Sequence, residues 1–342
     1  MTRKRVVIIG MGGTISSVLQ EKGFVPSHSS SDLVAFLPEI QDIYDIETRE
    51  VMSTDSSNIQ PDDWVELADV IFQEISRDDI HGVVVTHGTD TLTYSASAVA
   101  IMVQRHGKPV VFTGSQIPFM VPGSDGRKNL IDAIRVAADA DLAENVIVFN
   151  NKIFRSVRTL KLREYDLNAF ESVDPTVIGD LALEIHWNDP TARRRSNIKP
   201  VFNSKMNTNV ALVRLFPGMK PELLDQVVKC GYKGIILDAF GSGNVPIKEN
   251  SLLPKIKEIT AQNIPIVITS QCVFGTTELL YETGKLAHEA GAIQGMDYVA
   301  EVAMIKLMWV LGQEPESMEK ITELFQRNYV GEVNPAVVDF YN

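Results

Sequence analysis

Four short runs rich in valine and isoleucine occur in the first 150 residues, and helix-like segments separate them. The runs read RVVIIG, GVVVTHG, PVVFTGS and NVIVFNN, and they begin at Arg5, Gly82, Pro109 and Asn145. Such near-continuous apolar runs are typical of strands that are buried on both faces of a parallel sheet. Helices are expected between them, over residues 91–107 and 124–141. This alternation predicts a doubly wound α/β domain.

The chain has 342 residues, which exceeds the usual size of one domain. Residues 188–208 lose the apolar periodicity and gather arginine, asparagine, proline and serine, so we expect a linker there. Three further strand-like runs follow, VALVRL, GIILDAFGSG and IPIVITSQ, and then a helical segment. The sequence therefore predicts a larger domain over residues 1–187 and a smaller α/β domain over residues 209–342.

Charge and cysteine content exclude several classes of protein. The 44 acidic and 32 basic residues give a net charge of −12, which repels phosphate backbones and anionic lipids, so neither nucleic acid nor a membrane is an expected partner. Cys230 and Cys272 stand far apart with no neighbouring histidine, so no disulfide framework or zinc site is expected. The N-terminal apolar run lacks a cleavage site and is better explained as a first strand, which favours a cytoplasmic protein.

Polar residues follow the predicted strands at the points where ligands usually bind. In an open parallel sheet the ligand crevice lies beyond the carboxyl ends of the strands, and Thr14, Thr89, Asp90 and Ser115 occupy such turns. A dinucleotide-binding loop is excluded, because the third glycine of that motif would have to stand where the sequence has Ile15. No lysine pattern of a phosphate-binding loop follows either.

These hydroxyls could serve only as helix caps and turn residues, which is the commoner role for serine and threonine at strand ends. Thr14 differs because Gly12 and Gly13 remove neighbouring side chains and let its hydroxyl approach a ligand. A threonine nucleophile needs a base. His87 precedes the second turn, but a strand-end histidine is more often structural. A buried lysine is the other possible base, and the spacing does not identify which lysine.

The combination resembles the bacterial and archaeal type asparaginases and glutaminases, in their cytoplasmic type I form. That family carries a Gly-Gly-Thr-Ile loop near its N-terminus and a His-Gly-Thr-Asp-Thr loop further along, and GMGGTI and THGTDTL match both. The segments STDSSN, FTGSQIP, SDGRKNL and RTLKLREYD also fit the family, as do AFGSGNVP and ITSQCVFGTTEL near the C-terminus. The resemblance therefore covers nearly the whole chain.

The resemblance implies hydrolysis of the side-chain amide of L-asparagine to L-aspartate and ammonia, without a metal or organic cofactor. It makes Thr14 the nucleophile that forms an acyl-enzyme, with Thr89, Asp90 and Lys161 as a proton relay. The substrate-binding residues that it implies are Asp55, Ser56, Gly88, Ser115 and Asn244. Asn244 would be contributed by a neighbouring subunit, because family members are homodimers or homotetramers.

One position departs from the family pattern. The family places a tyrosine on the flexible loop that follows the first motif, whereas this chain reads KGFVPSHS there and has no tyrosine between Thr14 and Tyr44. Phe24 can close the loop by packing but forms no hydrogen bond through its side chain. We expect Phe24 to act as a lid residue.

The departure at Phe24 keeps other substrates open, namely glutamine, a D-enantiomer or a substituted amide. One methylene group in a pocket changes discrimination by only about 1 to 3 kcal/mol, so the sequence does not separate asparagine from glutamine. A further alternative is the ammonia-supplying subunit of the archaeal complex that makes glutaminyl-tRNA. That subunit usually carries an N-terminal extension before the first motif, whereas this chain has the motif at residue 12. The acidic charge of this chain also suits tRNA poorly, so both features argue against that alternative.

Overall fold

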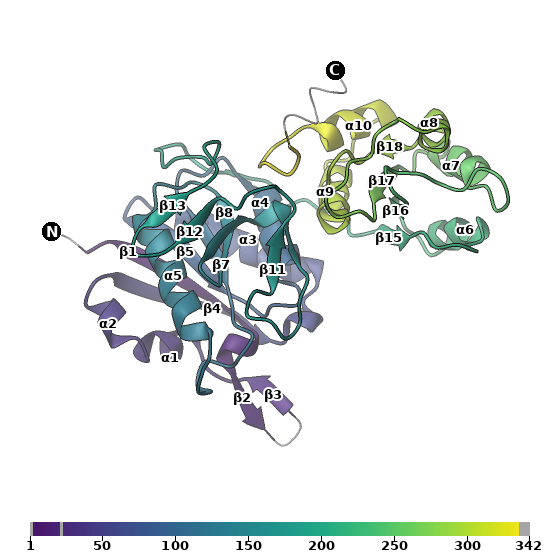
Figure 1. Cartoon of the computed structure of the whole chain (residues 1–342). Helices are drawn as coiled ribbons and strands as arrows, with labels where there is room; N and C mark the ends of the chain where they lie inside the picture. Colours follow the sequence, from purple (N-terminus) through teal and green to yellow (C-terminus); the bar gives the residue numbers. More distant parts are fainter. Residues whose placement is uncertain (1–2, 21–22, 335–342) are drawn as a thin grey trace. The chain divides into compact units, whose positions relative to one another are not determined.

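The computed structural model describes residues 3–20 and 23–334 (Figure 1). The chain divides into two compact units, Met1–Ser204 and Lys205–Asn342. We call these parts unit 1 and unit 2.

Unit 1 is built on an eight-stranded sheet with the order β13-β12-β9-β8-β7-β5-β1-β4. Five neighbouring strands are parallel: β4 (Asp45–Thr54), β1 (Arg5–Gly12), β5 (Ile80–Thr86), β7 (Val110–Thr113) and β8 (Asn145–Phe149). Three short antiparallel strands extend the sheet beyond β8: β9 (Lys152–Arg155), β12 (Gly179–Leu181) and β13 (Ile185–Trp187). The strand order reverses at β1, which has β4 on one side and β5 on the other. Ligand crevices form at such points.

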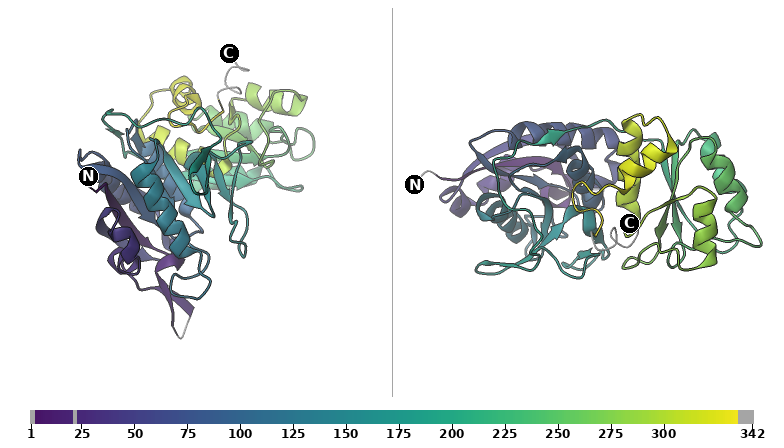
Figure 2. Two further views of the ribbon diagram at one scale, coloured as in Figure 1. Left: turned by 60° about the vertical axis from the view of Figure 1, so that its left-hand side comes forward. Right: turned by 90° about the horizontal axis from the view of Figure 1, so that it is seen from above.

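Helices cover both faces of this sheet (Figures 1 and 2). Apolar side chains of α1 (Ser30–Ala35), α2 (Pro38–Gln41) and α5 (Gly126–Asp139) share one core with Val6, Ile8, Val84 and Val111. The helices α3 (Pro61–Ile75) and α4 (Leu92–Met102) pack against each other and against β5 and β8. Successive side chains of a strand point to opposite faces, so both faces of the central strands are buried. The predicted doubly wound α/β fold is confirmed.

Two elements of unit 1 differ from the sequence expectation. The helix expected over residues 91–107 ends at Met102, because Val103–Gln104 forms a short strand, β6, that pairs with β14 (Val201–Phe202). Strand β4 was not expected at all, and its half-exposed, charged sequence explains why: it lies at the sheet edge and lacks a continuous apolar run. A hairpin of β2 (Ser17–Gln20) and β3 (Gly23–Pro26) projects from the sheet after the first motif (Figures 1 and 2).

The segment that precedes unit 2 is bonded to unit 1. Arg193 donates its backbone N–H to the Glu144 carboxylate at 2.8 Å, and the guanidinium group of Arg195 donates to the carbonyl oxygen of Ala137 at 2.7 Å. Together with the β14–β6 pairing, these contacts hold residues 193–202 against α5, Glu144 and β6, all of them within unit 1.

Unit 2 contains a parallel sheet of β15 (Val210–Arg214), β16 (Gly234–Ala239), β17 (Ile266–Ser270) and β18 (Ile293–Gln294). Three helices share a core with one face: α6 (Glu222–Lys229), α7 (Leu253–Thr260) and α8 (Glu282–Glu289). Helix α9 (Ala300–Gly312) contacts β15, β16 and β17, and α10 (Met318–Gln326) packs on α9. The predicted smaller α/β domain is confirmed. Within the described ranges, every helix is too short or too polar to span a bilayer.

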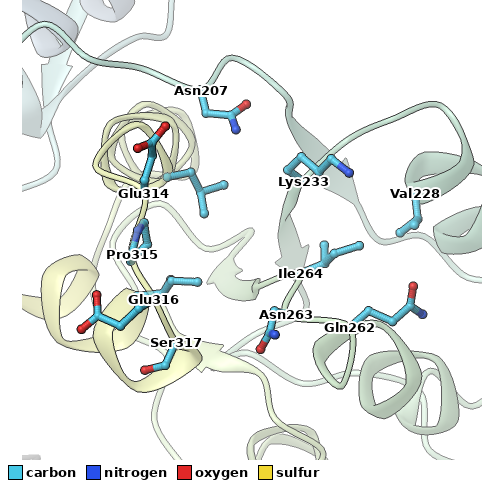
Figure 3. A pocket seen from close by; sticks show the side chains of 12 residues that line it. Asn207, Val228, Lys233, Gln262, Asn263, Ile264, Glu314, Pro315, Glu316 and Ser317 are labelled. Atoms are coloured by element: carbon cyan, nitrogen blue, oxygen red, sulfur yellow. The ribbon is translucent and has the colours of Figure 1, made fainter.

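A hollow of about 570 Å³ opens in unit 2 at the amino ends of its strands (Figure 3). Lys233 precedes β16, Ile264 precedes β17, and Glu314 follows α9. Parallel α/β sheets bind their ligands at the carboxyl ends of the strands, which is the opposite end from this hollow. The two motifs that carry Thr14 and Thr89 follow carboxyl ends of strands in unit 1.

Candidate active site

Four adjacent parallel strands of unit 1 lead into the candidate site. The carboxyl ends of β4, β1, β5 and β7 lie at one edge of the sheet because the strands run in the same direction. The predicted residues follow these ends in turn: Asp55 and Ser56 after β4, Thr14 after β1, Gly88, Thr89 and Asp90 after β5, and Ser115 after β7. With Lys161, which contacts Thr89, the fold gathers eight of the ten predicted site residues at this edge of the sheet of unit 1.

The turn after β1 and the turn after β5 touch through the backbones of Gly13 and Gly88. A methyl group built on Gly13 would lie 2.2 Å from the backbone nitrogen of Gly88, and one built on Gly88 would lie 2.6 Å from the hydroxyl oxygen of Ser56. Gly13 also has φ 83°, which side chains rarely adopt. Only glycine permits this approach. Thr14 and Thr89 each follow a glycine of the touching pair, so the two turns that carry them lie side by side.

Thr14 is the first residue of a short 3₁₀ helix, Thr14–Ser16. The hydroxyl groups of Ser16 and Ser17 donate to the carbonyl oxygen of Gly13, at 3.0 and 2.8 Å, and hold this turn in place. Thr14 is half-buried, and its own hydroxyl makes no hydrogen bond to any protein group among the described residues. The hydroxyl of Thr14 is therefore available to a ligand.

Lys161 supplies the cationic group of the site. It ends β10 (Thr159–Lys161), which pairs with β11 (Phe170–Ser172). Its Nζ donates to Thr89 Oγ1 at 2.9 Å and to Asp90 Oδ1 at 2.6 Å. Thr89 is buried, whereas the Asp90 side chain is 63% exposed and the Lys161 side chain 17% exposed. The three groups form one hydrogen-bonded chain that opens to solvent at Asp90, and a proton can move along such a chain.

Gln116 was not predicted and belongs to the same network. Thr89 donates its hydroxyl hydrogen to Gln116 Oε1 at 3.1 Å. Gln116 Nε2 donates to the backbone carbonyl oxygens of Glu164 and Asp166, the latter at 3.2 Å. Both acceptors lie on the loop after Lys161. The sequence signal was the position of Gln116 beside Ser115 in a strand-end turn, but its partners are distant in the sequence.

The remaining predicted residues of this edge are Asp55, Ser56 and Ser115. Asp55 accepts hydrogen bonds from the hydroxyl and backbone N–H of Ser57, at 2.6 and 2.8 Å, and these bonds hold its carboxyl pKa below the usual value. An ionised carboxylate suits an ammonium ligand. The backbone carbonyl of the buried Ser56 accepts from Thr91 Oγ1 at 2.7 Å. The Ser115 hydroxyl is buried and has no hydrogen-bond partner in the described part of the chain.

His87 is a structural residue. It is fully buried, and its ring nitrogens contact the carbonyl oxygen of Gly88 at 2.7 Å and the hydroxyl of Ser95 at 2.8 Å. A carbonyl only accepts, so Nδ1 carries the proton and Nε2 accepts from Ser95. Burial lowers the pKa of His87 to about 4, which keeps the ring neutral. His87 therefore positions the Gly88–Thr89 turn.

Two predicted residues remain predictions. The side chain of Phe24, the lid residue, lies outside the described part of the structure, although its backbone belongs to β3. Asn244 belongs to unit 2, where it follows β16 and accepts a hydrogen bond from Thr283 Oγ1 at 2.6 Å. As for metals, no group of three histidine, cysteine or acidic side chains that could hold an ion occurs within residues 3–20 and 23–334.

Comparison with protein families gives matches to both parts of the chain. The model of the asparaginase N-terminal domain matches residues 5–193, and that of the glutaminase/asparaginase C-terminal domain matches residues 209–325.

Individual relatives agree with these matches. L-asparaginase of Thermococcus kodakarensis is 36% identical over 335 residues, which are 96% of this chain and 99% of that protein, and its solved structure superposes with a TM-score of 0.89. L-asparaginase I of Vibrio cholerae superposes with a TM-score of 0.87 at 29% identity, over 97% of this chain and 100% of that one. One subunit of the glutamyl-tRNA(Gln) amidotransferase of Pyrococcus abyssi is 33% identical over 96% of this chain and 77% of its own length. The chain belongs to the asparaginase family.

Proposed function

We propose that this protein hydrolyses the side-chain amide of L-asparagine to L-aspartate and ammonia. The observation that carries the proposal is the hydrogen-bonded group of Lys161, Thr89 and Asp90, in a turn whose Gly88 touches Gly13, the residue before Thr14. The likeness to the L-asparaginase of Thermococcus kodakarensis over nearly the full length of both chains supports the choice of substrate.

Substrate binding uses the charged and polar groups at the strand ends. The α-ammonium group of asparagine pairs with the carboxylates of Asp55 and Asp90, of which Asp55 is held ionised by its bonds from Ser57. The α-carboxylate accepts hydrogen bonds from Ser56 and from the backbone N–H of the Gly88 turn. The buried Ser115 hydroxyl, which has no partner among the described residues, provides a further donor. This arrangement directs the side-chain amide toward Thr14.

Catalysis begins when the Thr14 hydroxyl attacks the amide carbon. The relay of Thr89 and Lys161 takes the hydroxyl proton and returns a proton to the departing ammonia, which leaves an aspartyl ester on Thr14. A water molecule then hydrolyses this ester with the relay as base, and L-aspartate is released. Backbone N–H groups of the glycine-rich turns stabilise the oxyanion, a role worth about 3 kcal/mol per donor in other acyl-transfer enzymes.

Assembly and location complete the proposal. We expect a homodimer or homotetramer in the cytoplasm, with Asn244 contributed to the site of a neighbouring subunit. Asn244→Ala should then raise KM for asparagine without altering the oligomer mass measured by light scattering.

The experiment that tests the function is ammonia release from L-asparagine, L-glutamine and D-asparagine by the purified protein, with Thr14→Ala and Lys161→Met beside it. Lys152→Met, on β9, serves as a lysine control away from the crevice. The proposal requires rapid turnover of L-asparagine that both site variants lose and the control keeps. Turnover of another amide alone assigns a different substrate to the same site. Absence of turnover by folded protein overturns the proposal and favours a subunit that works only with a partner, like the amidotransferase relative.

A further inference from the structure

The turns after β4, β1 and β5 carry most of the candidate site, and each of them contacts the other two. The backbone N–H of Gly13, after β1, donates to the carbonyl oxygen of Thr54, at the end of β4, at 2.9 Å. The turns after β1 and β5 touch through Gly13 and Gly88. Main-chain atoms make both of these contacts.

The contact between the turns after β4 and β5 depends on a side chain. The hydroxyl group of Thr91 donates to the backbone carbonyl oxygen of Ser56 at 2.7 Å. Ser56 is buried, and its carbonyl oxygen also accepts from the backbone N–H of Ile59 at 3.2 Å, within its own turn. Gly88 packs against the Ser56 side chain. The hydroxyl of Thr91 therefore ties the main chain of the β4 turn to the β5 turn.

Thr91 stands at a position where its hydroxyl would ordinarily serve its own helix. It is the N-cap residue of α4, and a threonine there usually accepts a hydrogen bond from a backbone N–H of the first turn. No side-chain bond of this kind caps α4 in the described part of the chain. The hydroxyl instead bonds to a turn that lies 35 positions earlier in the sequence.

We propose that Thr91 is a positioning residue that preorganises the substrate-binding turn after β4. In the proposed function, on which this inference rests, Asp55 and Ser56 bind the α-ammonium and α-carboxylate groups of the substrate. The bond from Thr91 holds the main chain of this turn in its binding-competent place before the substrate arrives, so binding does not have to order it. The family resemblance assigns no role to Thr91, although it stands in the second motif.

Three substitutions isolate the hydroxyl group of Thr91. Thr91→Ser keeps the donor, whereas Thr91→Val replaces it with a methyl group of similar size. Thr91→Ala removes the donor without placing a methyl group beside Ser56, so the test does not depend on one variant. Thr322→Val is the control, because Thr322 Oγ1 on α10 donates to the carbonyl oxygen of Met318 at 2.9 Å, a bond of the same kind in unit 2.

Steady-state kinetics with L-asparagine separate substrate binding from the chemical step. We expect Thr91→Val and Thr91→Ala to raise KM by about tenfold, because a loosened turn is binding-competent only part of the time. The value of kcat should change by less than about threefold, since bound substrate restores the turn and the bonds of Lys161 to Thr89 and Asp90 remain. Thr91→Ser and the control should keep the wild-type KM. An unchanged KM in the valine and alanine variants, or an equal rise in the serine variant, would overturn the proposal.

Backbone hydrogen exchange gives a second readout that does not depend on turnover. In the turn after β4, the N–H groups of Asn58 and Ile59 donate to the carbonyl oxygens of Asp55 and Ser56, at 3.0 and 3.2 Å. Without ligand, these two amides should exchange about tenfold faster in Thr91→Val and Thr91→Ala, and at the wild-type rate in Thr91→Ser and the control.

The two readouts separate this inference from the proposed function. If the wild-type protein hydrolyses no amide but the exchange rates of Asn58 and Ile59 behave as stated, the proposed function fails while the hold of Thr91 on this turn stands. If these rates are alike in the wild type and in all variants, the inference fails whatever the activity.

Discussion

Two lysine–carboxylate pairs, one chosen from each unit, differ in the access of their side chains to solvent. In unit 1 Lys161 pairs with Asp90 at 2.6 Å, with side chains that are 17% and 63% exposed. In unit 2 Lys306, on α9, pairs with Glu332, and both side chains are fully buried. The same two functional groups are therefore open in one unit and sealed in the other.

Every polar group of the sealed pair has a protein partner. Lys306 Nζ also donates to the carbonyl oxygen of Arg327 at 2.9 Å and lies 4.4 Å from the centre of the Tyr329 ring. Glu332 accepts from the backbone N–H groups of Tyr329 and Val330, at 3.1 and 2.7 Å. Although burial opposes its charged form, the neighbouring ammonium of Lys306 holds the pKa of Glu332 below its usual value. This pair fastens residues 327–332 to α9, whereas the open pair is accessible to solvent through Asp90.

The largest effect should come from removing the lysine of the open pair. Lys161→Met deletes the group that contacts both Thr89 and Asp90, so kcat/KM for L-asparagine should fall by about 10⁴-fold, the upper end for a general base. The melting temperature should change little, because the pair is open to solvent and contributes little to stability. Steady-state kinetics and thermal unfolding of the same preparation check both statements. A large loss of stability with retained activity would reverse the roles of the two pairs.

Breaking the sealed pair should give the opposite pattern. Lys306→Ala leaves the Glu332 carboxylate buried without its cation, which should lower the free energy of unfolding by about 4 kcal/mol. The value of kcat at temperatures well below melting should remain that of the wild type. The double variant Lys306→Met with Glu332→Leu should recover much of the loss, because it leaves no unpaired charge. Chemical unfolding measures these differences. If Lys306→Ala were as stable as the wild type, Lys306 and Glu332 would not form a buried pair that stabilises the fold.

His87 is a buried base without a carboxylate partner among the described residues, and it extends the comparison to the dependence of stability on pH. Burial lowers the pKa of His87 to about 4, below the value of about 6.5 in an unfolded chain. The unfolded state therefore binds more protons between these values, and stability should fall as the pH drops from about 6.5 to about 4, by about 3 kcal/mol in total. His87→Asn keeps a donor for Gly88 but does not titrate. Urea unfolding at several pH values should show a shallower slope for this variant; identical slopes would contradict the burial of a neutral ring.

The smallest change in stability is expected for an ion pair on the surface that lies outside the candidate site. Lys320 and Glu323 on α10 lie 2.8 Å apart with side chains 38% and 59% exposed. Lys320→Ala should shift the melting temperature by no more than about 2 °C, because solvent screens such pairs. Differential scanning calorimetry at low and high salt checks this. A larger shift would mean that the exposure of the side chains does not predict how much each of the three pairs contributes to stability.

The sequence predicted the parts of the fold whose burial shows in the local pattern. Residues 6–9 and 83–85 are apolar on both faces, so the central parallel strands could be recognised one at a time. Strand β4 escaped prediction because it lies at the edge of the sheet and alternates charged residues with half-buried ones. The early end of α4 depends on the pairing of β6 with β14, which is about a hundred residues away in the sequence.

The candidate site divides in the same way. Thr14, Thr89 and Asp90 stand in glycine-rich turns after strands, so their placement followed from local sequence and sheet topology. Lys161 was assigned only through the family resemblance, because it reaches Thr89 across 72 positions of the sequence. Gln116 was missed because its hydrogen bonds reach a loop at residues 164 to 166, and no local sequence pattern indicates such a contact.

In the proposed mechanism Thr14 attacks the amide, and the open relay of Thr89, Lys161 and Asp90 serves this attack. The most direct test is to quench the protein with acid during turnover of L-asparagine and to locate the aspartyl ester by peptide mass spectrometry, with Thr14→Ala as the control. We expect an ester on the peptide that contains Thr14, and none in the variant. An ester on Thr89, whose hydroxyl contacts Lys161 directly, would contradict this mechanism and make Thr89 the nucleophile.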